Sequence, residues 1–97
     1  MLHLINLEPE PAYTVPFVVD RSDAPRFRLT NIGTEAARAI TLTLLGPGVM
    51  LANAPNHLAP GETLEFTVRG ENLAQSTVAI VRWFRADESE YLWRVSF

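Results

Sequence analysis

The last third of the chain holds the residues whose types could recognise another molecule. Two stretches combine arginine with aromatic side chains, Arg82-Trp83-Phe84-Arg85 and Tyr91-Leu92-Trp93-Arg94. Aromatic rings supply large apolar contact areas and guanidinium groups form directional, stacked contacts, so this combination is typical of docking surfaces on proteins. The same rings, if exposed, could instead stack on sugars, with Trp83, Trp93 and Tyr91 as the platform.

Other polar residues offer weaker chemistry. The acidic group Asp87, Glu88 and Glu90 could supply oxygen ligands to a hard cation, but it lacks the spacing of a calcium loop, which favours a solvated hairpin tip. His3 and His57 stand far apart, with no partner at the spacing of a metal site or a catalytic pair. The sequence contains no G-x-S-x-G motif, phosphate-binding loop or glycosylation sequon. We therefore expect a protein that is not an enzyme and that uses no cofactor or metal.

Length and composition narrow the class of protein further. The chain has 97 residues with 8 basic and 11 acidic side chains, a net charge of −3, and a hydrophobic share of 47%. These values indicate one globular domain over residues 1–97. Cysteine is absent, so no disulfide can form. The mild, scattered acidity argues against a nucleic-acid partner, and no apolar run reaches the roughly 20 residues that span a bilayer.

The first residues bear on where the protein works. Residues 1–7 read MLHLINL, without the basic start of a secretory signal. We expect a cytoplasmic protein if the chain is full length, and an extracellular one if it is an excised domain.

The elements that must position these side chains are strands. Apolar and polar residues alternate between clusters of Gly, Pro and Asn, which is typical of short antiparallel strands. Strands are predicted over residues 2–7, 12–19, 26–30, 37–45, 49–51, 63–69, 77–85 and 91–97, with a polar turn at 20–25, a connection at 71–76 and no helix. Asn31-Ile32-Gly33 and Pro60-Gly61 predict tight turns, the second of type II. Seven to eight strands in this length predict an all-β, immunoglobulin-like antiparallel sandwich without a disulfide.

Several of these segments resemble a known family. The segments Leu29-Thr30-Asn31-Ile32-Gly33, Ile40-Thr41-Leu42-Thr43-Leu44 with Ala37 before it, Leu58-Ala59-Pro60-Gly61-Glu62 and Phe66-Thr67-Val68 resemble the adhesion-related immunoglobulin-like (CARDB-like) domains of bacteria and archaea. That resemblance covers about residues 27–68. It implies the sandwich fold and a role as a spacer or adhesion module, and it implies no catalytic residue, because the matching residues make turns and core.

The register of the last hairpin decides which of its side chains are exposed. A three-residue loop, Asp87 to Ser89, would set Trp83 opposite Trp93 and Val81 opposite Val95. One face would then carry only apolar residues, namely Ala79, Val81, Trp83, Tyr91, Trp93, Val95 and Phe97. The other face would carry the candidate interaction surface: Ile80, Arg82, Phe84, Leu92 and Arg94. A two- or four-residue loop would instead pair Phe84 with Trp93.

We therefore expect a non-enzymatic immunoglobulin-like module that binds a protein partner, or itself, through a sheet face or an edge strand. The candidate surface could also be covered by a terminal strand or by the N-terminal segment. The alternative function is a carbohydrate-binding accessory domain that uses exposed aromatic residues. Membranes and nucleic acids are not expected partners.

Overall fold

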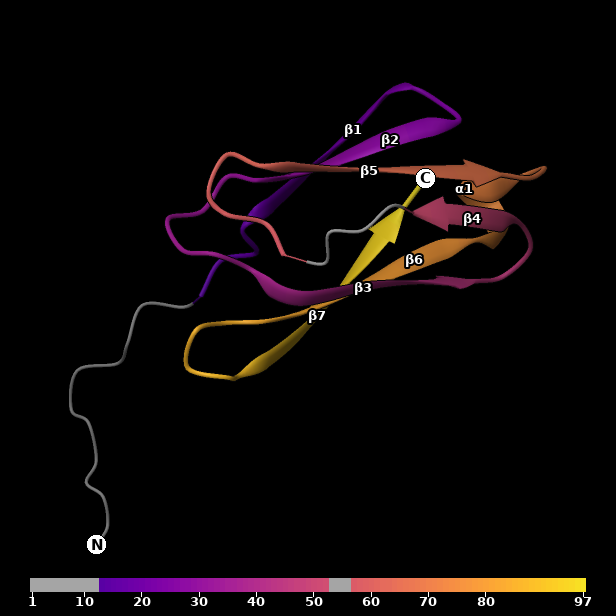
Figure 1. The fold of residues 1–97 in the computed structure, drawn as a ribbon. Helices are drawn as coiled ribbons and strands as arrows, with labels where there is room; N and C mark the ends of the chain where they lie inside the picture. The colour runs from indigo at the N-terminus through magenta and orange to yellow at the C-terminus, as the bar shows by residue number, and fades with distance from the viewer. Residues whose placement is uncertain (1–12, 53–56) are drawn as a thin grey trace, which may run out of the picture.

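A computed structural model describes residues 13–52 and 57–97. In this part of the chain, the elements in order are β1 (Phe17–Asp23), β2 (Arg26–Asn31), β3 (Arg38–Leu45), β4 (Val49–Ala52), β5 (Thr63–Arg69), α1 (Leu73–Ser76), β6 (Val78–Phe84) and β7 (Glu90–Ser96) (Figure 1). The strands form a four-stranded sheet in the order β1-β2-β5-β4 and a three-stranded sheet in the order β3-β6-β7. All neighbouring strands run antiparallel. The predicted all-β sandwich is confirmed, while the strand predicted at residues 2–7 lies outside the described residues.

The core forms where the inner faces of the two sheets meet. Alternation places Phe27 and Leu29 of β2, and Phe66 of β5, inside, each exposing at most 4% of its surface. The three-stranded sheet contributes buried side chains from β3, β6 and β7, including Ile40, Val81, Trp83 and Val95. Burying each such large side chain favours folding by roughly 1.5–3 kcal/mol relative to its exposure, so the alternating pattern is the main determinant of the fold.

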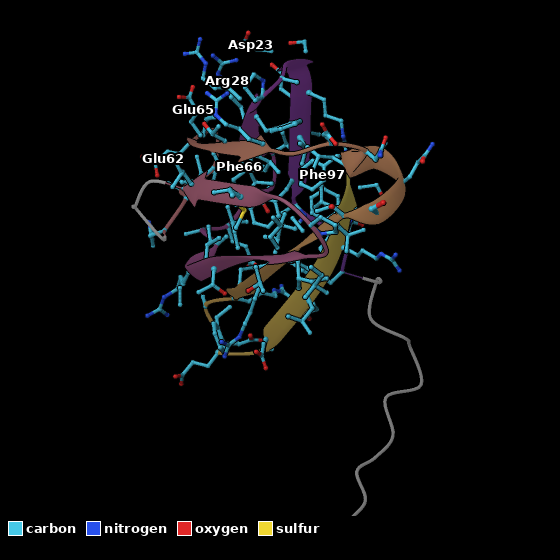
Figure 2. The ribbon with its side chains drawn as sticks, turned by 90° about the vertical axis from the view of Figure 1, so that its right-hand side faces the viewer. Asp23, Arg28, Glu62, Glu65, Phe66 and Phe97 are labelled. Carbon is cyan, nitrogen blue, oxygen red and sulfur yellow. The ribbon has the colours of Figure 1, made fainter. Side chains whose placement is uncertain are left out.

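The outer face of the four-stranded sheet is charged over β1, β2 and β5, whereas β4 exposes the apolar residues Val49 and Leu51. Arg28 of β2 lies 3.8 Å from the Asp20 carboxylate of β1 and 3.5 Å from the Glu65 carboxylate of β5. Asp23 lies 3.9 Å from Arg28 and 3.7 Å from Arg26. Figure 2 shows Asp23, Arg28 and Glu65 gathered on one side of the sheet. Exposed ion pairs contribute little to stability, so the effect of this network is to keep the face solvated.

One buried polar side chain ties the two sheets together at one end. Asn31 is fully buried at the end of β2. Its Oδ1 accepts a hydrogen bond from the Gly33 N–H at 2.8 Å. Its Nδ2 donates to the carbonyl oxygens of Glu35 at 3.0 Å and Leu58 at 2.9 Å. The first of these bonds makes the predicted Asn-x-Gly turn, and the other two fix that turn to segments that lie before β3 and before β5.

The backbone of Asn31 extends the same connection to the turn before β5. Its N–H donates to the Glu62 carbonyl at 3.0 Å, and its carbonyl accepts from the Gly61 N–H at 2.7 Å. Within that turn the Glu62 N–H donates to the Ala59 carbonyl at 3.0 Å, and Gly61 has φ +87°. A glycine with positive φ at the third position defines type II, so the predicted turn is confirmed.

The structure corrects two of the predicted boundaries. β1 begins at Phe17 rather than residue 12 and continues to Asp23, through most of the predicted polar turn at 20–25. Its polar residues stay extended because Asp20 pairs with Arg28 across the ladder and Asp23 pairs with Arg26. The connection at 71–76 contains α1, a helix of 4 residues, which is too short for sequence periodicity to reveal. None of the helical structure in the described ranges has the length and hydropathy to cross a membrane.

Candidate interaction surface

The loop between β6 and β7 sets the geometry of the surface. The Arg85 N–H donates to the Ser89 carbonyl at 3.0 Å, and the Glu88 N–H donates to the Arg85 carbonyl at 2.9 Å. Glu88 takes a left-handed conformation with φ +68°. A turn followed by one left-handed residue is the usual form of a three-residue hairpin loop. The loop therefore has the predicted length, but it consists of residues 86–88 instead of Asp87 to Ser89.

This displacement of the loop makes the predicted register wrong by two residues. Trp83 lies opposite Tyr91 instead of Trp93, and Val81 lies opposite Trp93 instead of Val95. Side chains alternate with a period of two, so a shift of two residues leaves every side chain on its predicted face. The predicted division between an apolar inner face and a mixed outer face is therefore correct, although the pairing is not.

The predicted register would also have set Arg82 opposite Arg94, and the observed pairing removes that repulsion between like charges. Arg82 lies opposite Leu92, and Arg94 lies opposite Ile80, so the two arginines do not face each other. The Arg82 guanidinium instead donates a hydrogen bond to the Glu90 carboxylate. The acidic residue at the start of β7 thus neutralises one of the two arginines and leaves Arg94 more open to another partner.

The inner face of the hairpin is an aromatic cluster. Trp83 is 1% exposed, and its indole N–H donates to the Tyr13 hydroxyl at 3.1 Å. Phe17 meets the Trp83 ring edge-on at 4.9 Å between centroids, and Tyr91 stacks on it at 5.7 Å. Tyr91 and Trp93 are half-buried. Trp83 is therefore a core residue and cannot be part of a sugar-binding platform.

Arg85 closes this cluster at the end of β6. Its guanidinium lies 4.1 Å from the centre of the Tyr13 ring and donates to the Glu35 carboxylate. The hydrogen bond to Glu35 is the main cause of a raised pKa of Arg85, and the interaction with Tyr91 is the second cause. This side chain therefore remains charged. Sequence reasoning missed the contact, because Tyr13 and Glu35 come from distant segments that carry no motif.

The five candidate residues lie together on the outer face of the sheet β3-β6-β7. Leu92 is 65% exposed, Ile80 and Phe84 are half-buried, and Arg82 and Arg94 are exposed. The Arg82 guanidinium lies 5.0 Å from the centre of the Phe84 ring. Arginine therefore covers part of this apolar surface by stacking while its charge stays in water. We call these five residues the outer patch.

The surface next to the outer patch is only gently hollowed. A depression of about 530 Å³ lies where α1 meets the sheet, and its lining includes Leu45, Ile80 and Arg94. A smaller one of about 230 Å³ is lined by residues that include Phe84 and Glu88. Both depressions lie over a sheet face or at its end.

The acidic hairpin tip has local hydrogen bonds that explain its residues. The Asp87 carboxylate accepts from the Ser89 hydroxyl at 2.5 Å and from the Ser89 N–H at 3.0 Å. These two bonds, the hydroxyl first, lower the pKa of Asp87. His57 is exposed, and His3 lies outside the described residues. Over residues 13–52 and 57–97, no three His, Asp or Glu side chains come together in a way that could hold a metal ion.

A scan of protein-family models found no match to this chain, and a search of curated proteins found none.

Proposed function

We propose that this chain is an immunoglobulin-like interaction module that is not an enzyme, and that it binds a protein partner or a second copy through the three-stranded sheet. The pairing of exposed apolar side chains with arginine on the outer face of β6 and β7 carries this proposal. That face holds Leu92, which is 65% exposed, between Arg82 and Arg94. On the other sheet, ion pairs cover the outer face of β1, β2 and β5, and the exposed apolar residues Val49 and Leu51 lie on the short edge strand β4. Apolar surface rimmed by arginine is a common composition of docking sites.

The order of the strands supports the immunoglobulin-like assignment. In constant-type immunoglobulin sandwiches, the first, second, fifth and fourth strands form one sheet, and the third, sixth and seventh form the other. The described strands follow the same order. The hydrogen bonds of Asn31 give a structural role to the turn residues that resemble those of the adhesion-related domains, and on this ground we also propose that the chain is related to that family.

The shape of the molecule supports a binding role over catalysis. Active sites usually lie in concave pockets where several polar groups converge. The lining of the larger depression mixes apolar residues with Ser, Thr and Gln; Arg94 is its charged member, and its lining includes no Asp, Glu or His. The aromatic residues that could hold a sugar are turned inward, and Trp83 is buried.

Photocrosslinking in cells that produce the protein tests this proposal. A photoreactive amino acid is placed at Leu92, and in a control protein at Val49, which is 63% exposed but lies on the other sheet. We expect adducts of discrete mass from position 92, containing a second copy or another protein, and none from position 49. Adducts from position 49 alone, or from neither position, would contradict the proposal.

Phe84→Glu gives an independent test of the outer patch. Because Phe84 is only half-buried and points outward, this variant should fold and should lose the adducts from position 92. Thermal unfolding checks the fold. A folded Phe84→Glu variant with unchanged crosslinking would exclude the outer patch as the binding site.

A further inference from the structure

We infer that the binding partner is a second copy of this chain. The β7 strands of the two copies would pair antiparallel, with a two-fold axis at Leu92. This inference rests on the proposed function and deepens it, because it names the occupant and the register. The two three-stranded sheets would join into one sheet that runs through both copies.

The first observation is that, among the described residues, one side of β7 carries no paired strand. β7 is the outermost strand of the sheet β3-β6-β7, and no other described strand pairs with its outer side. The hydrogen bond from the Arg85 N–H to the Ser89 carbonyl fixes which residues of the ladder exchange bonds with β6. Because hydrogen-bonded pairs alternate along an antiparallel ladder, the N–H and C=O groups of Glu90, Leu92 and Arg94 point away from β6.

A side chain from the other sheet already uses one of these outward groups. The Arg21 guanidinium of β1 donates two hydrogen bonds to the Ser96 carbonyl, at 3.0 and 2.9 Å. This contact confirms that the even-numbered residues of β7 direct their backbone groups to the free side. It also ends the open part of the edge, so that the segment from Glu90 to Arg94 is left for a new strand.

The second observation is that this segment is complementary to itself. It reads Glu90-Tyr91-Leu92-Trp93-Arg94, with opposite charges at its ends and aromatic residues on both sides of a central leucine. In an antiparallel pair centred on Leu92, Glu90 faces Arg94 of the second copy, and Leu92 faces its own equivalent. Tyr91 likewise faces Trp93. Opposite charges and aromatic pairs directly across from each other stabilise antiparallel strands.

The faces of these residues agree with such a pairing. Glu90, Leu92 and Arg94 are exposed on the outer face, and Tyr91 and Trp93 are half-buried on the inner face. The Glu90 carboxylate, which already accepts a hydrogen bond from Arg82, would also receive Arg94 of the second copy, in a row with Leu92. The two outer patches would become continuous across the dimer. A foreign peptide would need its own Glu and Arg in the same order and at the same spacing, whereas a second copy supplies both without further requirement. A two-fold axis also closes the assembly at two chains.

Charge exchange tests the register directly in sedimentation equilibrium experiments on the intact chain. We expect the wild type to dimerise reversibly. Arg94→Glu sets Glu opposite Glu twice in each dimer, and Glu90→Arg sets Arg opposite Arg twice, so each variant alone should dissociate about tenfold more readily or worse. A mixture of the two variants restores opposite charges at both positions and should form heterodimers with affinity near that of the wild type.

Lysine substitutions identify the edge and separate the possible outcomes. Leu92→Lys should abolish dimerisation, while Val49→Lys, at a similarly exposed position on the edge strand β4, should not. If Glu90→Arg does not fold, Arg94→Glu and Leu92→Lys still decide the edge. The inference is overturned if the wild type stays monomeric at millimolar concentration. It is also overturned if the charge-exchange variants dimerise as strongly as the wild type, or if only Val49→Lys abolishes the dimer. In those cases, crosslinks from position 92 to a different protein would leave the proposed function standing.

Discussion

Replacing Asn31 with alanine is expected to lower the free energy of unfolding by about 2–4 kcal/mol. The side chain is fully buried and makes three hydrogen bonds, to Gly33, Glu35 and Leu58. Alanine removes all three and leaves their backbone partners behind.

The magnitude follows from what each backbone group retains. The Leu58 carbonyl keeps its hydrogen bond from the Ala37 N–H at 2.9 Å. Gly33 and Glu35 are half-buried, so water can replace part of what their groups lose. No backbone group is therefore left fully unsatisfied, and each lost hydrogen bond costs its net contribution of about 0.5–1.5 kcal/mol, so the loss of three bonds gives the expected range. In a domain of this size the melting temperature should fall by about 10–25 °C.

Asn31→Asp separates the hydrogen bonds from simple loss of volume. The variant keeps an oxygen for the Gly33 N–H but sets a second oxygen against two carbonyl groups. Burial and these carbonyls should raise the pKa of the introduced carboxyl above its usual value near 4. The folded state then holds the proton more tightly than the unfolded state. The variant should therefore be closest to the wild type below pH 4 and should lose stability as the pH rises through the raised pKa.

Urea denaturation followed by tryptophan fluorescence measures both variants against the wild type at several pH values. Asn72→Gly is the control, because Asn72 is exposed, has a left-handed φ of +55° and makes no capping hydrogen bond. It should change stability by only a few tenths of a kcal/mol. An Asn31→Ala protein within 1 kcal/mol of the wild type, or an Asn31→Asp deficit that shrinks as the pH rises, would refute the reasoning about this residue.

Two further predictions concern turns. Gly46→Ala should destabilise the protein much more than Gly61→Ala, since a Cβ at Gly46 would lie 2.2 Å from the Ser76 carbonyl oxygen, whereas one at Gly61 meets no atom within 4 Å. The second variant should cost only the left-handed backbone strain, about 1–2 kcal/mol, and equal losses in urea unfolding would contradict this account. Ser89→Ala should move the pKa of Asp87 up toward its ordinary value, as measured by carboxyl NMR titration. A carboxyl whose pKa is lowered in the folded state stabilises that state at neutral pH, and this stabilisation is lost as the pH falls through the lowered pKa. The Ser89→Ala variant should therefore lose less stability on acidification than the wild type. An unchanged pKa of Asp87 in the variant would rule out the hydroxyl as the cause.

Local patterns were enough to predict most of the sandwich. The strand predicted at 63–69 matches β5, because Leu64, Phe66 and Val68 alternate with polar residues and all three are buried. The faces of the last hairpin were also predictable, since they depend only on alternation. Its register was not, because the loop lacks glycine and nothing local indicates that Glu88 adopts the left-handed conformation.

The long-range contacts at the loop end of the last hairpin, and those of Asn31, could not be read from the sequence. Tyr13 reaches Trp83 across 70 positions, and Arg85 reaches Glu35 across 50. Asn31 was predicted as a turn former, and it is one, but its bond to Leu58 depends on how the two sheets are stacked. Such long-range pairs follow from topology, which short motifs do not specify.

The bulge in β3 makes the two edge strands of the three-stranded sheet differ in their ability to pair with a further strand. Between Arg38 and Thr41 this strand carries an extra residue against β6, with Ala39 at φ +50°, and just before it Ala37 is already bridged to Leu58. Such kinked, partly occupied borders resist addition of further strands. Growth of the three-stranded sheet by strand addition would therefore be confined to its opposite border, so this sheet can join to one other sheet but cannot be extended from both sides.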